Sequence, residues 1–271
     1  MNSSKKHTFG LTNNQLKIIA MVSMLLDHIG LLFFPEISIA QMLATIAPSA
    51  LPYLDNETVM LFLNVPIFRA LGRIAFPIFA YMIAEGCRHT KNRAKYLGMI
   101  GGMAIVFQIV YFVAMGSLYQ GILVTFLLAI IAIYSIDGLL FPKRKFWGRV
   151  AAIFGLAFVA VFVWVLPRVL VGTDYDLDYG IWGILLPILV YFMPNRFLKT
   201  SGASLFLIIR ALFYIFVEPM PLQAWSLLTI PLLALYNGER GKRKMKYVFY
   251  IFYPAHLVIL YGIAMLIEIL K

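Results

Sequence analysis

The chain has 271 residues, of which 62% are hydrophobic and only 13% are charged. This balance excludes an ordinary soluble globular protein and is typical of a membrane protein with several spans. The net charge of +11 does not indicate a nucleic-acid-binding protein, because the basic residues stand in short segments between long apolar runs. The single cysteine, Cys87, excludes an internal disulfide and a cysteine-based zinc site, and we predict no metal.

A helix that crosses the hydrocarbon core of a bilayer needs about 20 mostly apolar residues. This length predicts an all-α bundle with about nine membrane-spanning helices, at residues 15–34, 62–86, 95–115, 118–137, 148–171, 181–194, 203–217, 221–236 and 247–270. The sixth to eighth runs are short and proline interrupts their region, so a re-entrant pair is the alternative there. No polar segment is long enough for a soluble domain, so we predict a single domain over residues 1–271.

The segments between these runs alternate in charge. Basic groups precede the first run and follow the second, fourth, sixth and eighth, whereas the other loops are acidic or neutral. Basic loops of membrane proteins stay in the cytoplasm. We therefore expect an inner-membrane protein with a cytoplasmic N-terminus and, since nine is odd, a C-terminus on the outer side.

Some ionisable residues stand inside the apolar runs, where each costs about 2.5–3.5 kcal/mol at a helix centre unless it is paired or hydrated. Asp27 and His28 are adjacent, and a rise of about 1.5 Å per residue places His28 roughly 18 Å into the membrane. Arg69 and Arg73 share a face of the second run and reach a similar depth from the opposite side. His256, about ten residues into the last run, reaches this depth from the cytoplasmic side. These five residues are candidates for one buried polar chamber. Structural pairing between helices, such as Asp27 with Arg69, is the alternative.

Two neighbouring residues on a helix point about 100° apart, so Asp27 and His28 cannot both face the same partner. Lys17 stands eleven residues before His28 and lies on the same stripe of the helix, about 16 Å away. An extended cofactor with an anionic head would fit along that line. The alternative is that Lys17 extends its ammonium group to the membrane surface.

Two further groups of residues are candidates for ligand contacts. The run that follows the second helix is rich in groups that bind phosphate: Arg88, His89, Lys91 and Arg93. This run is also explained as a loop that only sets the topology. Pro254 lies inside the last run, where it frees a backbone carbonyl and would direct Tyr253 and His256 inward. With Arg210 and Glu85, these two side chains are our candidates for contacts with a substrate.

Three blocks of the sequence resemble the TraX family, which is typified by the F-pilin acetylase of conjugative plasmids. They are "LKIIAMVSMLLDHIGLLFFP", "RALGRIAFPIFAYMIAEGCRHTKNRAKYL" and "KYVFYIFYPAHLVILY", about a quarter of the chain. The TraX family is in turn similar to the broad superfamily of membrane acyltransferases that acetylate O-antigens and other cell-surface molecules. A hallmark of that superfamily is a basic residue, ten intervening residues and a histidine in the first helix, and Lys17 and His28 have this spacing. Its second hallmark, an arginine pair after a glycine-containing helix end, has only a less regular counterpart in "EGCRHTKNRAK".

The resemblance implies transfer of an acyl group, expected to be acetyl, from cytoplasmic acetyl-CoA to an acceptor on the outer side of the membrane. The acceptor would offer an amine or a hydroxyl, as a peptide or pilin N-terminus, a glycan or a lipid headgroup does. Besides this acceptor and the membrane lipids, a second copy of the chain is a possible partner. Lys17 and the region of Arg88 to Arg93 would hold the nucleotide phosphates.

In this scheme His28 is the general base or briefly carries the acyl group. Asp27 would orient or charge-balance a basic partner, and Arg69 or Arg73 would stabilise the oxyanion. A proton-coupled transporter or channel is the alternative function, because it also needs ionisable residues near the membrane midplane. A structural membrane subunit of a secretion or conjugation machine is a third hypothesis.

Overall fold

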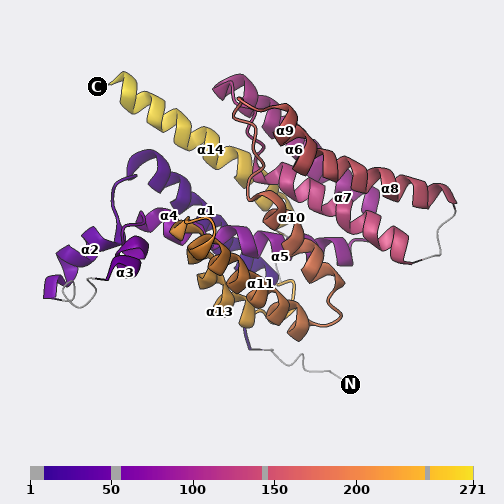
Figure 1. The fold of residues 1–271 in the computed structure, drawn as a ribbon, viewed down its shortest axis with the longest axis horizontal. Helices are drawn as coiled ribbons and strands as arrows, with labels where there is room; N and C mark the ends of the chain where they lie inside the picture. The colour runs from indigo at the N-terminus through magenta and orange to yellow at the C-terminus, as the bar shows by residue number, and fades with distance from the viewer. Residues whose placement is uncertain (1–8, 50–55, 142–145, 242–244, 271) are drawn as a thin grey trace. The chain divides into compact units, whose positions relative to one another are not determined.

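The computed structural model describes residues 9–49, 56–141, 146–241 and 245–270, and every regular element within these ranges is a helix (Figure 1). The predicted all-α class is therefore confirmed. The chain divides into two compact units, which we describe separately: unit 1 contains residues 1–79 and 204–271, and unit 2 contains residues 80–203. The divisions fall inside two helices, α5 (Ala75–His89) and α11 (Arg196–Phe216), so each of these helices contributes to both units.

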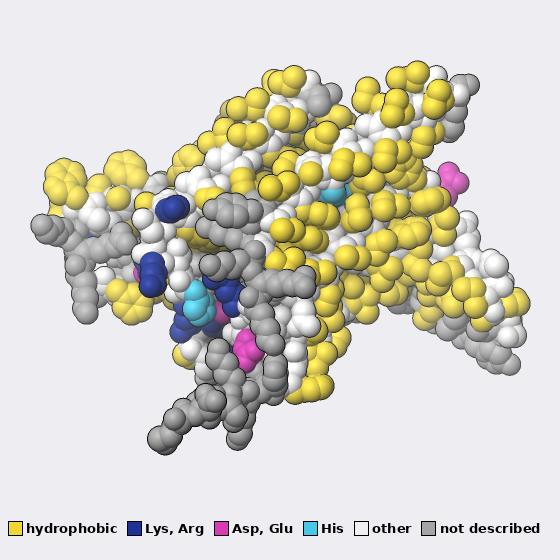
Figure 2. All heavy atoms as spheres, turned by 180° about the vertical axis from the view of Figure 1, so that it is seen from behind, with side chains coloured by type: hydrophobic (Ala, Val, Ile, Leu, Met, Phe, Trp, Pro, Cys, Tyr) yellow, Lys and Arg dark blue, Asp and Glu magenta, His cyan; other side chains and the backbone are white. Residues whose placement is uncertain are grey.

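Within the described ranges, seven helices are long and apolar enough to cross a bilayer: Asn13–Phe33, Ile67–His89, Arg93–Val113, Ile122–Leu140, Phe146–Val169, Arg196–Phe216 and Ile251–Ile269. They overlap seven of the nine predicted runs, and they make the chain a multi-pass membrane protein. The sixth and eighth runs form shorter apolar helices, at Gly180–Phe192 and Pro221–Ala234. Figure 2 shows how few charged side chains interrupt the hydrophobic side chains on one face.

The seventh run is longer than predicted. It was expected at residues 203–217, but α11 begins at Arg196, because the side chain of Asn195 accepts a hydrogen bond from the Leu198 N–H at 2.9 Å. The charged residues before residue 203, which we expected in a loop, therefore belong to the first turns of a membrane helix.

In unit 1, α1 (Asn13–Phe33) begins at a capping box. The Thr12 hydroxyl accepts from the Gln15 N–H, and the Gln15 side chain accepts from the Thr12 N–H. Backbone hydrogen bonds also join the start of α1 to residues 235–239, since the Leu11 N–H donates to Leu235 O at 2.7 Å and the Asn13 N–H donates to Glu239 O at 2.8 Å. The chain thus returns to the start of α1 shortly before α14 (Lys246–Ile269) begins.

Helix α4 (Ile67–Gly72) packs antiparallel to α1 through two glycines. Gly30 faces Phe68 closely enough that a Cβ on it would lie 2.4 Å from the Phe68 Cβ. Nearer the start of α1, Gly72 faces Asp27, and a Cβ on Gly72 would lie 2.3 Å from Asp27 Oδ1. The absence of side chains at these two positions is what lets the backbones approach, as small residues do between membrane helices.

Helix α14 packs parallel to α1. Lys17 of α1 lies against Phe249, and His28, further along α1, lies against His256. Both helices therefore start at the same end of unit 1 and run in the same direction, as Figure 1 also shows.

Two short helices that the sequence analysis did not predict lie between α1 and α4. They are α2 (Ile39–Ile46), which starts at a capping box of Ser38 and Gln41, and α3 (Glu57–Leu63). Ile39 forms a small core with Val65 and Ala70, against which side chains of α3 and of the 3₁₀ helix η3 (Trp225–Leu228) pack. Helix η3 stands between α12 (Pro221–Ala224) and α13 (Thr229–Ala234). The predicted second run, 62–86, is thus the end of α3 followed by α4 and α5.

Unit 2 is arranged around α7 (Ile122–Leu140), which is buried on most of its sides. Three helices pack against it: α6 (Arg93–Met115), α8 (Phe146–Ala160) and α10 (Gly180–Phe192). Gly155 and Gly183 allow two of these approaches, next to Ser135 and Thr125 of α7. Helix α8 continues through a π-helical turn, η2 (Val161–Val165), into α9 (Leu166–Val169). The exposed faces of α6 and α8 are apolar, as lipid contact requires.

We predict that Gly72→Ala destabilises the protein. The added Cβ would overlap the Asp27 side chain, and overpacking of this kind costs about 1–3 kcal/mol. The melting temperature in detergent should fall, whereas Gly262→Ala, where a Cβ meets nothing within 4 Å, should leave it unchanged or raise it. Equal melting temperatures for the two variants would show that α1 and α4 do not pack closely at Gly72.

Candidate active site

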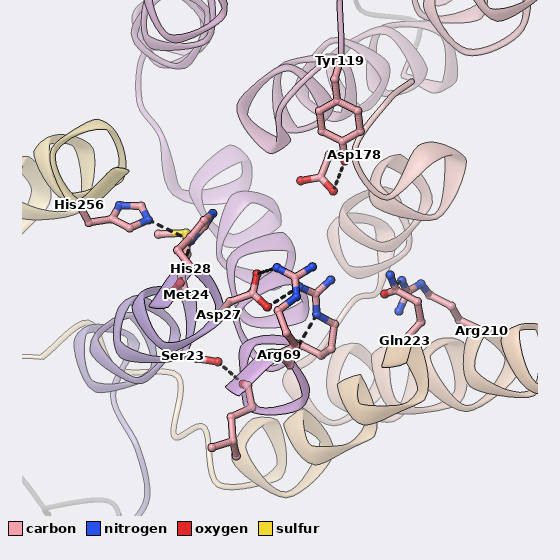
Figure 3. Close-up of polar contacts among 12 residues, drawn as sticks. Ser23, Met24, Asp27, His28, Arg69, Tyr119, Asp178, Arg210, Gln223 and His256 are labelled. Atoms are coloured by element: carbon pink, nitrogen blue, oxygen red, sulfur yellow. Dashed lines mark hydrogen bonds and ion pairs between the residues drawn. The ribbon is translucent and has the colours of Figure 1, made fainter. Parts of the chain in front are cut away.

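The carboxylate of Asp27 binds two arginines, one in the neighbouring helix α4 and one directly after its end (Figure 3). Arg69 Nη1 donates to Asp27 Oδ2 at 3.0 Å, and Arg73 Nη2 donates to Asp27 Oδ1 at 2.5 Å. Arg73 also donates from Nε to the Arg69 carbonyl oxygen at 3.3 Å. Asp27 and Arg73 are 8% and 7% exposed, so this is a buried ion-pair cluster inside unit 1.

The structural pairing that was the alternative for Asp27 is therefore present. Both carboxylate oxygens of Asp27 are directed at guanidinium groups, and the hydroxyl of Ser23, one turn earlier, donates to the Leu71 carbonyl. Two guanidiniums and one carboxylate give the cluster a formal charge of +1. Inside a bilayer such charges persist when they are paired with one another. The cluster fixes the rotation of α1 about its own axis.

This rotation turns His28 toward α14, where it meets His256 (Figure 3). The two imidazole centroids are 5.0 Å apart, and His256 Nε2 lies 3.3 Å from His28 Nδ1. Each ring also contacts the backbone of its own helix: His28 Nδ1 is 2.9 Å from Met24 O, and His256 Nδ1 is 2.8 Å from Phe252 O. The structure thus brings together two of the predicted site histidines.

The surroundings of His256 are aromatic. The ring of Phe252 stacks on His256 with centroids 4.8 Å apart, and Tyr253 meets it edge-on at 5.9 Å. Helix α14 continues through Pro254, and His256, two residues later, is 4% exposed. The predicted inward orientation of His256 is thus found, with Tyr253 beside it.

Lys17 lies on the same helix as His28, near the end at which α1 and α14 both begin. Its ammonium nitrogen is 5.0 Å from the centroid of Phe249, a cation–π contact, and the side chain is half-buried. The Asn14 N–H, one turn earlier, donates to the Arg240 carbonyl at 3.3 Å, so a second basic residue comes from the loop before α14.

Arg210 belongs to a different cluster of unit 1. It is fully buried in α11, donates to Gln223 Oε1 at 2.7 Å and to Ser226 Oγ at 3.3 Å, and lies over the rings of Phe76 and Tyr214. These contacts tie α11 to α12 and η3. We predicted a substrate contact for Arg210 because it is an arginine in an apolar run, and its position explains it equally as a structural residue.

In unit 2, the two arginines that we expected to bind phosphates have partners within the protein. Arg88 donates from Nη1 and Nη2 to the carbonyl oxygens of Tyr191, Met193 and Pro194, at the C-terminal end of α10. Arg93 donates to Asp137 Oδ2 at 2.6 Å, and Tyr191 shares that carboxylate at 3.2 Å. Unpaired helix-terminal carbonyls and a carboxylate are strong acceptors, so these contacts account for Arg88 and Arg93 without a ligand.

Glu85 forms a buried ion pair with Lys199 in unit 2, in which Lys199 Nζ contacts Glu85 Oε1 directly. His89, one turn after Glu85, lies 3.8 Å from the second carboxylate oxygen of Glu85, and its own side chain is largely exposed. Lys91 is exposed. The structure therefore assigns Glu85 a structural partner.

A second polar contact region of unit 2 joins the loop after α6 to the loop before α10. Tyr119 donates its hydroxyl to Asp178 Oδ1 at 3.0 Å (Figure 3), and Thr125 donates to the Asp178 carbonyl at 2.8 Å. Burial and then the Asp178 carboxylate raise the pKa of the Tyr119 phenol, so the phenol keeps its proton and remains a donor. These two loops hold α6, α7 and α10 together at one end.

Two charged residues of these clusters, Asp137 and Lys199, were not among our candidates. Asp137 is the last residue of the predicted fourth run, and Lys199 was assigned to a loop. The charges of the loops could have predicted these contacts. By the loop charges, the third run starts on the cytoplasmic side and the fourth run ends there. The ends that carry Arg93 and Asp137 were therefore expected on one side, and the same holds for Glu85 and Lys199.

Comparison with known proteins identifies the family. Residues 12–264, nearly the whole chain, match the family described as "TraX protein". The chain belongs to the TraX family. A relative from Dichelobacter nodosus, "Probable fimbrial assembly protein FimC, serogroup H1", is 25% identical to this TraX-family protein, and the similarity covers 94% of the chain and 96% of the relative. No solved structure matches the chain.

We predict that Asp27→Asn strongly lowers the melting temperature of the protein. Removing one partner of a buried ion pair costs about 3–5 kcal/mol, since it leaves the charge of Arg73 uncompensated. Glu36→Gln, at an exposed site after α1, serves as the control for the loss of one carboxylate. A melting temperature of Asp27→Asn equal to that of the wild type would contradict the ion-pair cluster.

Proposed function

We propose that this TraX-family protein is a membrane acyltransferase that moves an acetyl group from acetyl-CoA to an acceptor on the other side of the membrane. The observation that carries the proposal is His28, a histidine in the middle of a membrane helix. The carbonyl of Met24 can only accept a hydrogen bond, so the proton of neutral His28 is on Nδ1 and the lone pair is on Nε2. His28 Nε2 is then the base.

The chemistry of this proposal balances in one step. His28 Nε2 accepts the proton of the acceptor amine or hydroxyl while that nitrogen or oxygen bonds to the acetyl carbonyl carbon. The carbon–sulfur bond breaks, and the departing thiolate takes the proton from His28. Arg69 is the candidate for stabilising the developing oxyanion, since its bond to Asp27 uses one of its five N–H donors and its side chain is 22% exposed.

The donor is proposed to enter from the end of unit 1 at which α1 and α14 begin. Lys17 stands there, on the helix that carries His28, and an ammonium group binds phosphate as a point charge. Eleven residues of α1 separate the two, a rise of about 16 Å, which is suitable for an extended thioester arm. Lys17 is favoured over Arg88 and Arg93 because both arginines have acceptors within unit 2.

The topology proposed with this function has the N-terminus in the cytoplasm and the C-terminus outside, in the inner membrane, with nine spans. The parallel course of α1 and α14 supports an odd number of spans, because a chain that re-enters at the same side must cross an odd number of times in between. The two short apolar helices, Gly180–Phe192 and Pro221–Ala234, would complete nine.

The acceptor is proposed to be the N-terminal amine of a pilin-type subunit. The name of the Dichelobacter nodosus relative refers to fimbrial assembly, and this supports a fimbrial acceptor for the present chain. Glycans and lipid headgroups with a hydroxyl are the other candidates. Isolated membranes that release free thiol from acetyl-CoA would favour the enzyme, whereas solute uptake into vesicles without thiol release would favour a transporter.

We predict that His28→Ala abolishes acyl transfer. Loss of the general base lowers kcat by on the order of 10²–10⁴-fold. The measurement is acceptor-dependent thiol release from acetyl-CoA by membranes that contain equal amounts of each variant. Leu31→Ala, on the exposed face of the same helix, should retain activity. Near wild-type thiol release by His28→Ala would remove His28 from the mechanism.

For Lys17→Met we predict a KM for acetyl-CoA that is about tenfold higher or more, with kcat little changed. Methionine keeps the apolar stem but loses the charge-assisted bond to phosphate, which is worth about 1.5–3 kcal/mol. Lys17→Arg should restore most of the affinity, and Ile18→Ala, at the exposed neighbouring position, should not alter KM. An unchanged KM in Lys17→Met would place the nucleotide elsewhere.

A further inference from the structure

The hydrogen bonds of the two histidines determine which nitrogen of each ring carries the proton. His256 Nδ1 lies 2.8 Å from the carbonyl oxygen of Phe252, which can only accept, so neutral His256 is protonated on Nδ1. Its Nε2 is therefore an acceptor. This acceptor lies 3.3 Å from His28 Nδ1, the nitrogen whose proton also faces Met24 O. The proton of His28 Nδ1 is thus shared between two acceptors, one of them on α14.

We propose that His256 is the positioning residue for His28, and this inference rests on the proposed acyl transfer. By accepting from Nδ1, His256 holds His28 in the tautomer whose Nε2 is free to take the acceptor's proton. When His28 gains that proton, its Nδ1–H becomes a stronger donor, and the bond to His256 tightens as charge develops. His256 touches neither substrate in this account and acts through His28.

A carboxylate usually has this role beside a catalytic histidine. Asp27 is adjacent in the sequence, but its two oxygens bind Arg69 of α4 and Arg73, the residue that follows α4. The side chain that reaches Nδ1 of His28 therefore comes from α14, more than two hundred residues later in the chain. Unlike a carboxylate, an imidazole carries no negative charge, so His256 orients the ring of His28 without holding the transferred proton there, and the departing thiolate can take it.

The position of His256 is over-determined, as orienting residues require. Its Nδ1 is bonded to Phe252 O, its ring stacks on Phe252 with an interplanar angle of 7°, and Tyr253 packs against its edge. With 4% exposure, the ring has little freedom to rotate. The charged groups nearest to this pair on α1, on α4 and directly after α4 are Asp27, Arg69 and Arg73, and both arginines bind the Asp27 carboxylate.

Three substitutions of His256 separate the effect of its acceptor atom from the effect of its size. His256→Gln places an amide oxygen near the position of Nε2 and can accept from His28. His256→Asn keeps a donor for Phe252 O but is too short to reach His28. His256→Phe keeps the ring and its stacking but has no acceptor. Ile259→Ala, at an exposed position of α14, is the control.

The assay is acceptor-dependent thiol release by the full-length protein in vesicles, together with the melting temperature of each variant. We expect His256→Gln to retain kcat within about threefold of the wild type, whereas His256→Asn and His256→Phe lose on the order of 10²-fold in kcat at unchanged KM. An equal loss in all three variants, or full activity in His256→Phe, would overturn the proposal.

A second measurement does not depend on activity. In protein with ¹⁵N-labelled histidine, the Nδ1–H resonance of His28 should shift in His256→Asn and His256→Phe and keep its position in His256→Gln. A resonance of His28 that is the same in all variants would show that the two rings are not hydrogen-bonded, whether or not the protein consumes acetyl-CoA. If the wild type is active and the His28 resonance is the same in all variants, the role of His256 is refuted and the acyltransferase is not. Absence of thiol release from the wild type, with the expected shifts, would refute the acyltransferase and retain the pairing.

Discussion

The paired charges of Asp27, Arg69 and Arg73 are the constraint on which the arrangement of unit 1 depends. Ionised groups inside a bilayer must find partners, and one carboxylate held between two guanidiniums does this between α1 and α4. Glycine at positions 30 and 72 lets the two helices come close enough for the bonds to form. With α1 fixed in this way, the next residue, His28, points about 100° further around the helix and faces α14, which supplies His256.

Much of this arrangement could be predicted from the sequence, since it follows from the length of the apolar runs and from the period of the α-helix. Apolar runs of about 20 residues marked the helices, and the 100° separation of neighbouring positions meant that Asp27 and His28 would serve different partners. Equal depth grouped Arg69, Arg73 and His256 with them. What depth could not give was the division into pairs: Asp27 with the arginines, and His28 with His256. That division depends on how α1 is rotated against its two neighbours.

The sequence was least informative about residues at helix ends. Arg88 and Arg93 were grouped as phosphate ligands because they are basic and close in sequence, but in unit 2 their donors meet helix-terminal carbonyls and the Asp137 carboxylate. Lys199 was assigned to a loop, because a lysine lowers the hydropathy of a run, but it lies in the first turns of α11, where Glu85 pairs with its charge. The helices α2 and α3 were missed since both are shorter than any membrane span. Capping and tertiary partners, which hydropathy ignores, decided all of these cases.

In the proposed acetyl transfer, the donor and the acceptor are on opposite sides of the membrane. The most direct measurement uses sealed vesicles that contain the purified protein in one orientation, with radiolabelled acetyl-CoA on one side and a peptide with a free N-terminal amine on the other. We expect labelled peptide when acetyl-CoA is on the side of Lys17 and the peptide is on the opposite side, and none when their sides are exchanged. No labelled peptide in either arrangement, or labelling only when both reactants share one side, would contradict the proposed transfer.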